Sequence, residues 1–211
     1  NNPTGVALPA TALAGLARRF PSVVFVVDET GVEFVPESQG VSLLPGVPPA
    51  NVAIVRSPSP LAGLAGLRAG FMVASEDLCG LVERAREPQR LSLPAAAAAE
   101  ALLSEVPPAP ESRREVIAER ERLRDRLSHL AGLRVFRSQA SFLLLKITRP
   151  GLTSAALCER LLRCRILARN AAAFRGLDGR YLRVAVRGAA DNDRLVEAMT
   201  LSLGEGKAQA S

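Results

Sequence analysis

The chain has 211 residues, of which 48% are hydrophobic and 23% charged, a composition typical of a globular protein with a sizeable core. The net charge is +6, but arginines alternate with acids and aromatic residues make up only 4%, so we expect no nucleic-acid partner. There is no apolar run long enough to span a membrane, and the three cysteines lack metal-ligand spacing. We therefore expect a cytoplasmic protein with no membrane span and no metal site.

The first part of the chain predicts helices that alternate with short apolar strands. Continuous β-branched runs such as residues 22–27, which lead into Asp28, are typical of buried parallel strands. We expect helices at 10–19, 75–87 and 94–105, and strands at 22–27, 51–56 and 70–74. These strands should form one mainly parallel sheet. Its last strand can run antiparallel, because the connection before it is too short for a crossover helix.

The second part of the chain has a different pattern. A long amphipathic helix is predicted at 111–130, after the proline-rich break at 107–110. We then expect strands at 133–136, 141–147, 166–168 and 181–186, and helices at 153–163, where Thr153 is the cap, and 191–203. The predicted domains are residues 1–108, which are α/β, and residues 109–211, which are α+β and include the linking helix.

Four motifs occur in an order and at a spacing that together are specific. They are Asn1-Asn2-Pro3-Thr4-Gly5, Asp28-Glu29, the segment 57–71 and Tyr181-Leu182-Arg183-Val184-Ala185-Val186-Arg187. The series resembles the class I/II, or fold-type I, aminotransferases that depend on pyridoxal 5'-phosphate (PLP). It is most similar to the branch of histidinol-phosphate aminotransferase and threonine-phosphate decarboxylase of cobalamin synthesis. The resemblance implies part of a large PLP-binding domain with a mainly parallel sheet, followed by a smaller C-terminal domain.

The resemblance also implies roles for individual residues. Asp28, at the carboxyl end of a strand, would hold the pyridine nitrogen of PLP and keep the ring an electron sink. Arg183 would grip the substrate carboxylate with both of its terminal nitrogens. The full implied set is Asn2, Asp28, Ser57, Ser59 and Arg68 for the cofactor, and Arg183 and Arg169 for the substrate.

The sequence departs from the family at the position that matters most for catalysis. The lysine that forms the Schiff base is replaced by Pro60, which has no amine, so we assign no catalytic residue. The only lysines are Lys146 and Lys207, in a predicted strand and in the tail. Gly31 also replaces an aromatic residue that follows the Asp-Glu pair in the family. We expect that no internal aldimine forms on this chain.

Three interpretations remain open at the level of sequence. The first is a PLP-dependent enzyme that transfers an amino group or decarboxylates a phosphorylated amino acid, as a homodimer. The second is a non-catalytic relative that binds a ligand or regulates a partner, and the third is a decayed or N-terminally truncated product. In each case Asp28 and Arg68 should face one cleft that Arg183 reaches from the smaller domain. Lacking upstream strands, the first sheet should expose an edge and favour aggregation.

Overall fold

The computed structural model describes residues 1–36, 40–44, 46–57, 63–87, 91–104 and 110–204. They form two compact units. One unit is Ala7–Arg113, and the other combines Asn1–Val6 with Arg114–Ser211. The first six residues therefore belong with the C-terminal part of the chain. The boundary predicted between residues 108 and 109 lies outside the described residues and stays a prediction.

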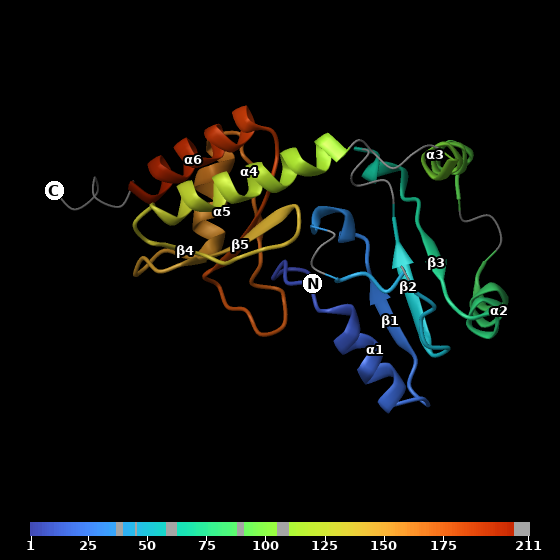
Figure 1. The fold of residues 1–211 in the computed structure, drawn as a ribbon. Coiled ribbons are helices and arrows are strands. Elements are labelled where there is room, and N and C mark those ends of the chain that lie inside the picture. The colour runs from blue at the N-terminus through green and yellow to red at the C-terminus, as the bar shows by residue number, and fades with distance from the viewer. Residues whose placement is uncertain (37–39, 45, 58–62, 88–90, 105–109, 205–211) are drawn as a thin grey trace. The chain divides into compact units, whose positions relative to one another are not determined.

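The unit Ala7–Arg113 contains a sheet of three strands, in the order β1 (Phe25–Asp28), β2 (Val52–Arg56), β3 (Phe71–Val73) (Figure 1). Strand β1 runs parallel to β2, with Phe25 opposite Val52. Strand β3 runs antiparallel to β2, which confirms the direction inferred from its short connection. The sheet is thus mixed, and the expected parallel arrangement holds for one of its two pairings.

The core of this unit forms where helix α1 (Ala10–Arg19) packs on one face of the sheet. Ala17, Leu43, Val52 and Ile54 are buried there, and Phe25 and Val27 lie against them. Asn51 ties the end of the helix to the strands, because its side-chain amide donates to the backbone oxygens of Ala17 at 3.0 Å and Val23 at 2.8 Å. The remaining described elements are the 3-10 helices η1 (Val32–Phe34) and η3 (Ala65–Leu67) and the helices α2 (Glu76–Ala85) and α3 (Leu93–Ser104).

The other unit is an antiparallel sheet covered by helices. Its strands are β4 (Leu133–Val135), β5 (Phe142–Ile147), β6 (Arg169–Asn170) and β7 (Tyr181–Ala185), in the order β4-β5-β7-β6. Its helices are α4 (Pro110–Ser128), which begins in the other unit, α5 (Ser154–Arg163) and α6 (Ala189–Gly204). No helix among the described residues is long and apolar enough to cross a membrane.

Two local predictions in this unit have different outcomes. Thr153 caps helix α5 as expected, since its hydroxyl accepts a hydrogen bond from the backbone of Ala156 at 3.2 Å. The strand predicted at 166–168 is wrong, and pairing begins only at Arg169. The reason is that the backbone N–H of Ile166 bonds back to Leu161 and closes the end of α5, which leaves Leu167 exposed.

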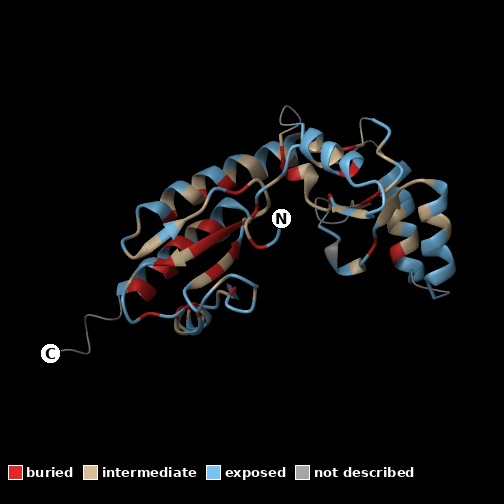
Figure 2. Ribbon diagram, turned by 90° about the horizontal axis from the view of Figure 1, so that it is seen from below, coloured by how far each residue is buried: buried red, intermediate tan, exposed pale blue. Residues whose placement is uncertain are grey.

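Alternation along β5 and β7 separates the two faces of this sheet. Leu143, Leu145 and Ile147 point to one face, together with Leu182 and Val184 of β7, and all five are buried. Helices α4, α5 and α6 cover that face with leucines and a methionine. The intervening residues of both strands, among them Phe142, Lys146 and Arg183, point to the opposite, outer face. Leu144 is buried as well, but it lies on this outer face, opposite Arg183. Figure 2 shows the buried residues of the chain in red.

The outer edge of β1 has no partner among the strands that the structure describes. Val26, within β1, is 69% exposed, and Val24, just before the strand, is 55% exposed. A sheet edge with exposed valines offers unpaired backbone groups and apolar surface to another copy of the chain. Strand β1 is thus an edge strand among the described strands, and the aggregation expected from the sequence stays a prediction.

We predict that Val26→Lys reduces self-association, because a charge on an edge strand opposes pairing between edges. Light scattering of the purified chain at increasing concentration measures the effect. The matched control is Val47→Lys, which makes the same exchange at a valine that is 96% exposed but lies outside the strands. Equal effects of the two substitutions would show that added charge, and not the edge, controls association.

Candidate functional site

The carboxyl end of β1 carries two adjacent acids in opposite environments. Asp28 is exposed, and one of its oxygens accepts hydrogen bonds from the backbone and the hydroxyl of Thr30, at 2.9 and 2.6 Å. No described residue donates to its second oxygen, Oδ2. The carboxylate is thus held in one orientation with one oxygen available, an arrangement that fits a cationic N–H donor such as a protonated pyridine nitrogen.

Glu29 is the buried acid of the pair and has a structural role that the sequence did not reveal. It is 5% exposed, and its Oε2 accepts hydrogen bonds from Nε and Nη2 of Arg56 at 3.1 and 2.8 Å. Its other oxygen accepts from the backbone of Leu43 at 2.8 Å, and Ser42 bonds to both Glu29 and Arg56. Leaving either charge of such a buried pair alone is costly, so this network fixes the loop around residue 42 against β2.

The predicted phosphate-binding residues are only partly within the described chain. Ser57 lies there, but its hydroxyl donates to the backbone oxygen of Ala69 at 2.6 Å. Its one proton is therefore directed to protein and not outward to an anion. Arg68 is exposed and ends helix η3 in the left-handed conformation, at φ 57°. Ser59 and Pro60 lie outside the described residues.

The other unit brings together three predicted residues that are distant in sequence. Arg183 donates to the side-chain oxygen of Asn2 at 2.7 Å, across a separation of 181 residues. The turn that carries Asn2 is fixed by Gly5, whose backbone oxygen accepts from Gln139 at 2.7 Å. Gly5 has φ +70°, and a Cβ there would lie 2.0 Å from the hydroxyl of Ser138, so glycine is required.

Arg169 lies directly opposite Arg183, on neighbouring strands β6 and β7. Burial and the nearby charge of Arg169 both lower the pKa of Arg183. Each guanidinium also packs over an aromatic ring, Arg183 over Phe142 at 4.6 Å and Arg169 over Phe174 at 5.1 Å. Within the described chain neither arginine forms a salt bridge with a carboxylate. We call Asn2, Arg169 and Arg183 the Arg183 site, and its chemistry is that of an anion receptor.

The two aromatic supports were not predicted, although the sequence contains a signal for one of them. Phe142, Leu144 and Lys146 alternate with the apolar core residues of β5, so Phe142 belongs to the face that carries Arg183. Phe174 lies in the connection between β6 and β7, where no periodicity marks it. Among the described residues no group of His, Cys, Asp and Glu could hold a metal ion.

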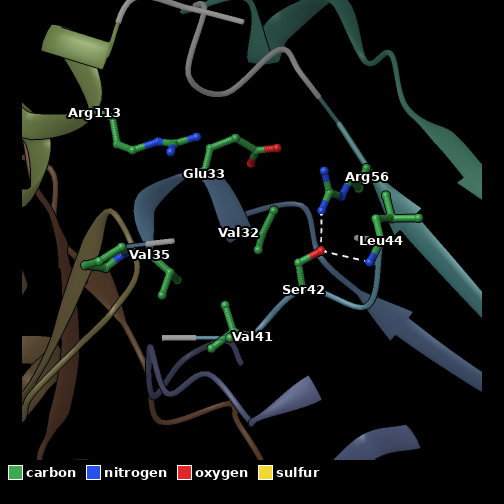
Figure 3. Close-up of a pocket in the computed structure, with 10 residues that line it drawn as sticks. Val32, Glu33, Val35, Val41, Ser42, Leu44, Arg56 and Arg113 are labelled. Atoms are coloured by element: carbon green, nitrogen blue, oxygen red, sulfur yellow. Dashed lines mark hydrogen bonds between the residues drawn. The ribbon is translucent and has the colours of Figure 1, made fainter. Parts of the chain in front are cut away.

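A separate pocket of about 470 Å³ lies in the unit Ala7–Arg113 (Figure 3). Its wall is mostly apolar, with Val32, Val35 and Leu44, and Glu33 lies between Arg113 and Arg56. Burial raises the pKa of Glu33, and the attraction of the two arginines offsets this only in part. The sequence analysis assigned no functional role to these pocket residues.

We predict that Glu33→Gln stabilises the chain at neutral pH. When folding raises the pKa of a carboxyl, the folded protein loses stability as the pH rises from the pKa of the unfolded state through that of the folded state. The substitution removes that loss, so the midpoint of thermal unfolding should rise by about 2 °C at pH 7. The gain should vanish below pH ~4, where Glu33 is protonated in both states. A lower midpoint at pH 7 would mean that the attraction of Arg56 and Arg113 outweighs burial.

The folded chain is similar to solved structures of a decarboxylase and an aminotransferase. It matches the structure of L-threonine-O-3-phosphate decarboxylase from Porphyromonas gingivalis with a TM-score of 0.83 at 28% identity, over 97% of this chain and 62% of that one. It matches histidinol-phosphate aminotransferase from Sinorhizobium meliloti, solved in complex with pyridoxal-5'-phosphate, with a TM-score of 0.84 over 97% and 55% of the two chains. At 23% identity the second match shows the fold alone.

Residues 1–199 match the family model described as aminotransferase class I and II, and the chain belongs to that family. It is 34% identical over 199 residues to histidinol-phosphate aminotransferase 2 of Archaeoglobus fulgidus, over 94% of this chain and 55% of that protein. It is 33% identical over 203 residues to threonine-phosphate decarboxylase of Salmonella typhimurium, over 94% and 54%. The chain thus spans about half the length of the curated relatives that it matches.

The residues of this chain do not fit covalent attachment of PLP. Within the described residues the only lysine is Lys146, which lies on β5 with its amine 5.2 Å from the ring centre of Tyr181. Lys207 and Pro60 lie outside the described residues, and proline has no amine in any conformation. Asp28 suits the ring nitrogen of the cofactor, whereas Ser57 directs its proton elsewhere. We therefore assign no reaction step to the cofactor on this chain.

Proposed function

We propose that this chain is an aminotransferase-like protein that binds a phosphorylated amino acid or amino alcohol without attaching PLP covalently. The observation that carries the proposal is the Arg183 site, where Arg183 holds Asn2 at 2.7 Å and lies opposite Arg169. The relatives are named for histidinol phosphate and threonine phosphate, and a phosphate ester is common to both. In this chain catalysis is impaired, and ligand binding or regulation of a partner is the remaining role.

The charge balance of the Arg183 site supports a doubly charged ligand. Two guanidinium groups opposite each other repel, and neither has a carboxylate partner among the described residues. A phosphate monoester carries up to two negative charges at neutral pH and can accept hydrogen bonds from both arginines. Asn2 and the rings of Phe142 and Phe174 hold the guanidinium planes in place, which lowers the entropy lost on binding.

The finer architecture forms part of the same proposal. We infer that residues 1–108 correspond to a portion of the large domain of the family and residues 109–211 to its small domain. Asp28, Ser57, Ser59 and Arg68 would then line the cofactor side, with Arg183 and Arg169 on the substrate side. We also expect a homodimer. The finding that supports this assignment is the match of 97% of the chain to solved members of the fold.

Substitution of the central arginine tests the proposed ligand site. Calorimetric titration with O-phospho-L-threonine should show that Arg183→Gln weakens binding about tenfold or more, since a charge-assisted hydrogen bond is lost. Arg163→Gln is the matched control, because Arg163 is an exposed arginine on α5 and helix α5 packs on the other face of the sheet. Equal affinities of the wild-type chain and the Arg183→Gln variant would contradict the proposed function.

The absence of covalent attachment has its own test. We predict that the chain mixed with PLP develops no band at about 410–430 nm, the region of a protonated Schiff base. Borohydride should leave no pyridoxyl group on Lys146 or Lys207. A Pro60→Lys variant supplies an amine at the family position and serves as the positive control. A pyridoxyl adduct mapped to either native lysine would overturn the prediction.

A further inference from the structure

The outer face of the four-stranded sheet carries a second pair of like charges. Arg134 on β4 lies directly opposite Lys146 on β5, just as Arg169 lies opposite Arg183 on β6 and β7. Like charges in directly opposed positions destabilise an antiparallel pair. The same unfavourable arrangement thus occurs twice on one face of one sheet.

Both cations of this second pair also lie over aromatic rings. The guanidinium of Arg134 is 5.1 Å from the ring centre of Phe136, and the amine of Lys146 is 5.2 Å from that of Tyr181. The two rings stack on each other, with centres 6.2 Å apart and planes inclined by 23°. Cation–π contacts of this kind hold each charge in position while leaving its N–H donors available. The construction therefore repeats that of the Arg183 site.

No carboxylate among the described residues forms a salt bridge with Arg134 or Lys146. Asp178 is an acid that Lys146 influences: its pKa is lowered mainly by Arg180 and to a smaller extent by Lys146. Asp178 is already engaged by Arg180, which contacts it through its guanidinium at 3.1 Å and through its backbone N–H at 2.9 Å. Within the described residues, the Arg134–Lys146 pair therefore has the electrostatic influence of Asp178 but no salt bridge.

We propose that Arg134 and Lys146 form a second anion-binding site, the Lys146 site, for the phosphate group of a small molecule. A dianion placed between two opposed cations removes their repulsion and accepts hydrogen bonds from both. Tyr181, which pairs with Lys146, is two residues along β7 from Arg183, a distance of about 7 Å. The two pairs of cations are thus neighbours on one face, and the Lys146 site uses none of the residues of the Arg183 site.

The aromatic rings favour a small ligand over single-stranded nucleic acid. Binding of nucleic acid without sequence preference relies on aromatic faces that stack with bases. Here Phe136 and Tyr181 stack on each other, and each also carries a cation. Their faces are already engaged within the protein, so the cations supply the affinity and the rings supply the positioning.

The lysine content of the chain permits a direct test by nuclear magnetic resonance. The sequence has only two lysines, so carbon-13 labelling of lysine gives one side-chain signal for Lys146 and one for Lys207, an internal control. Titration with inorganic phosphate at constant ionic strength should shift the Lys146 signal to saturation and leave Lys207 without saturation. Arg134→Gln should weaken this response about fivefold, whereas Arg183→Gln should change it less than about twofold.

Four outcomes would reject the Lys146 site. It is overturned if Lys146 responds no more than Lys207, or if chloride at equal ionic strength gives the same shift. Loss of the response in Arg183→Gln would mean that the two pairs form a single site. The last alternative is a nucleic-acid surface. It would be identified if a twelve-residue thymidine oligonucleotide shifted the Lys146 signal at a lower concentration, counted in phosphate groups, than inorganic phosphate does. Failure of the calorimetric test of the Arg183 site, with the Lys146 response intact, would reject only the proposed function.

Discussion

The alternation of side chains along β5 and β7 is the constraint on which the C-terminal unit depends. Because successive residues of a strand point to opposite faces, burial of Leu143, Leu145 and Leu182 under the helices places Lys146 and Arg183 on the other face, where Leu144 is also buried. A shift of one residue in either strand would bury these charges. The burial of the core thus determines where the cations lie, and the antiparallel register determines which of them are neighbours.

That register places like charges opposite each other at two points. Arg169 faces Arg183 and Arg134 faces Lys146, and aromatic rings hold all four side chains. Stabilisation by cation–π contacts offsets part of the repulsion, but an anion would offset more, since it carries the opposite charge. Binding of anions at the two proposed sites would recover the stability that this repulsion costs. Proteins commonly accept local instability at the sites that bind their ligands.

The unit Ala7–Arg113 divides its acids according to the same principle of burial. Glu29 is surrounded by Arg56, Ser42 and the backbone of Leu43, so its charge is balanced inside the protein. Asp28, one residue earlier, is exposed and bonds only to Thr30 among the described residues. The two neighbouring acids therefore have opposite environments. Glu29 is paired inside the protein, whereas Asp28 accepts from Thr30 through one oxygen and has no donor to its second oxygen among the described residues.

The sequence by itself determined most of the helices and strands and showed that position 60 is a proline and not a lysine. Apolar runs and helix periodicity predicted the strands of both sheets apart from β6, because each pattern reflects local burial. The resemblance to the family directed attention to Asn2, Asp28 and Arg183, and Pro60 supplies no amine at the position where that family carries its lysine. Asp28 and Glu29, however, are indistinguishable as sequence, and only folding decided which is buried.

The tertiary structure decided the pairing of residues that the chain keeps far apart. Asn2 meets Arg183 across 181 residues, and Arg169 meets Arg183 through a two-residue strand that sequence analysis had placed at 166–168. Neither contact follows from local patterns, because both depend on strand order and register. These arise when the whole unit buries its core. The residue types of the proposed site were therefore readable from the sequence, and the approach of Asn2 and Arg169 to Arg183 was a property of the fold.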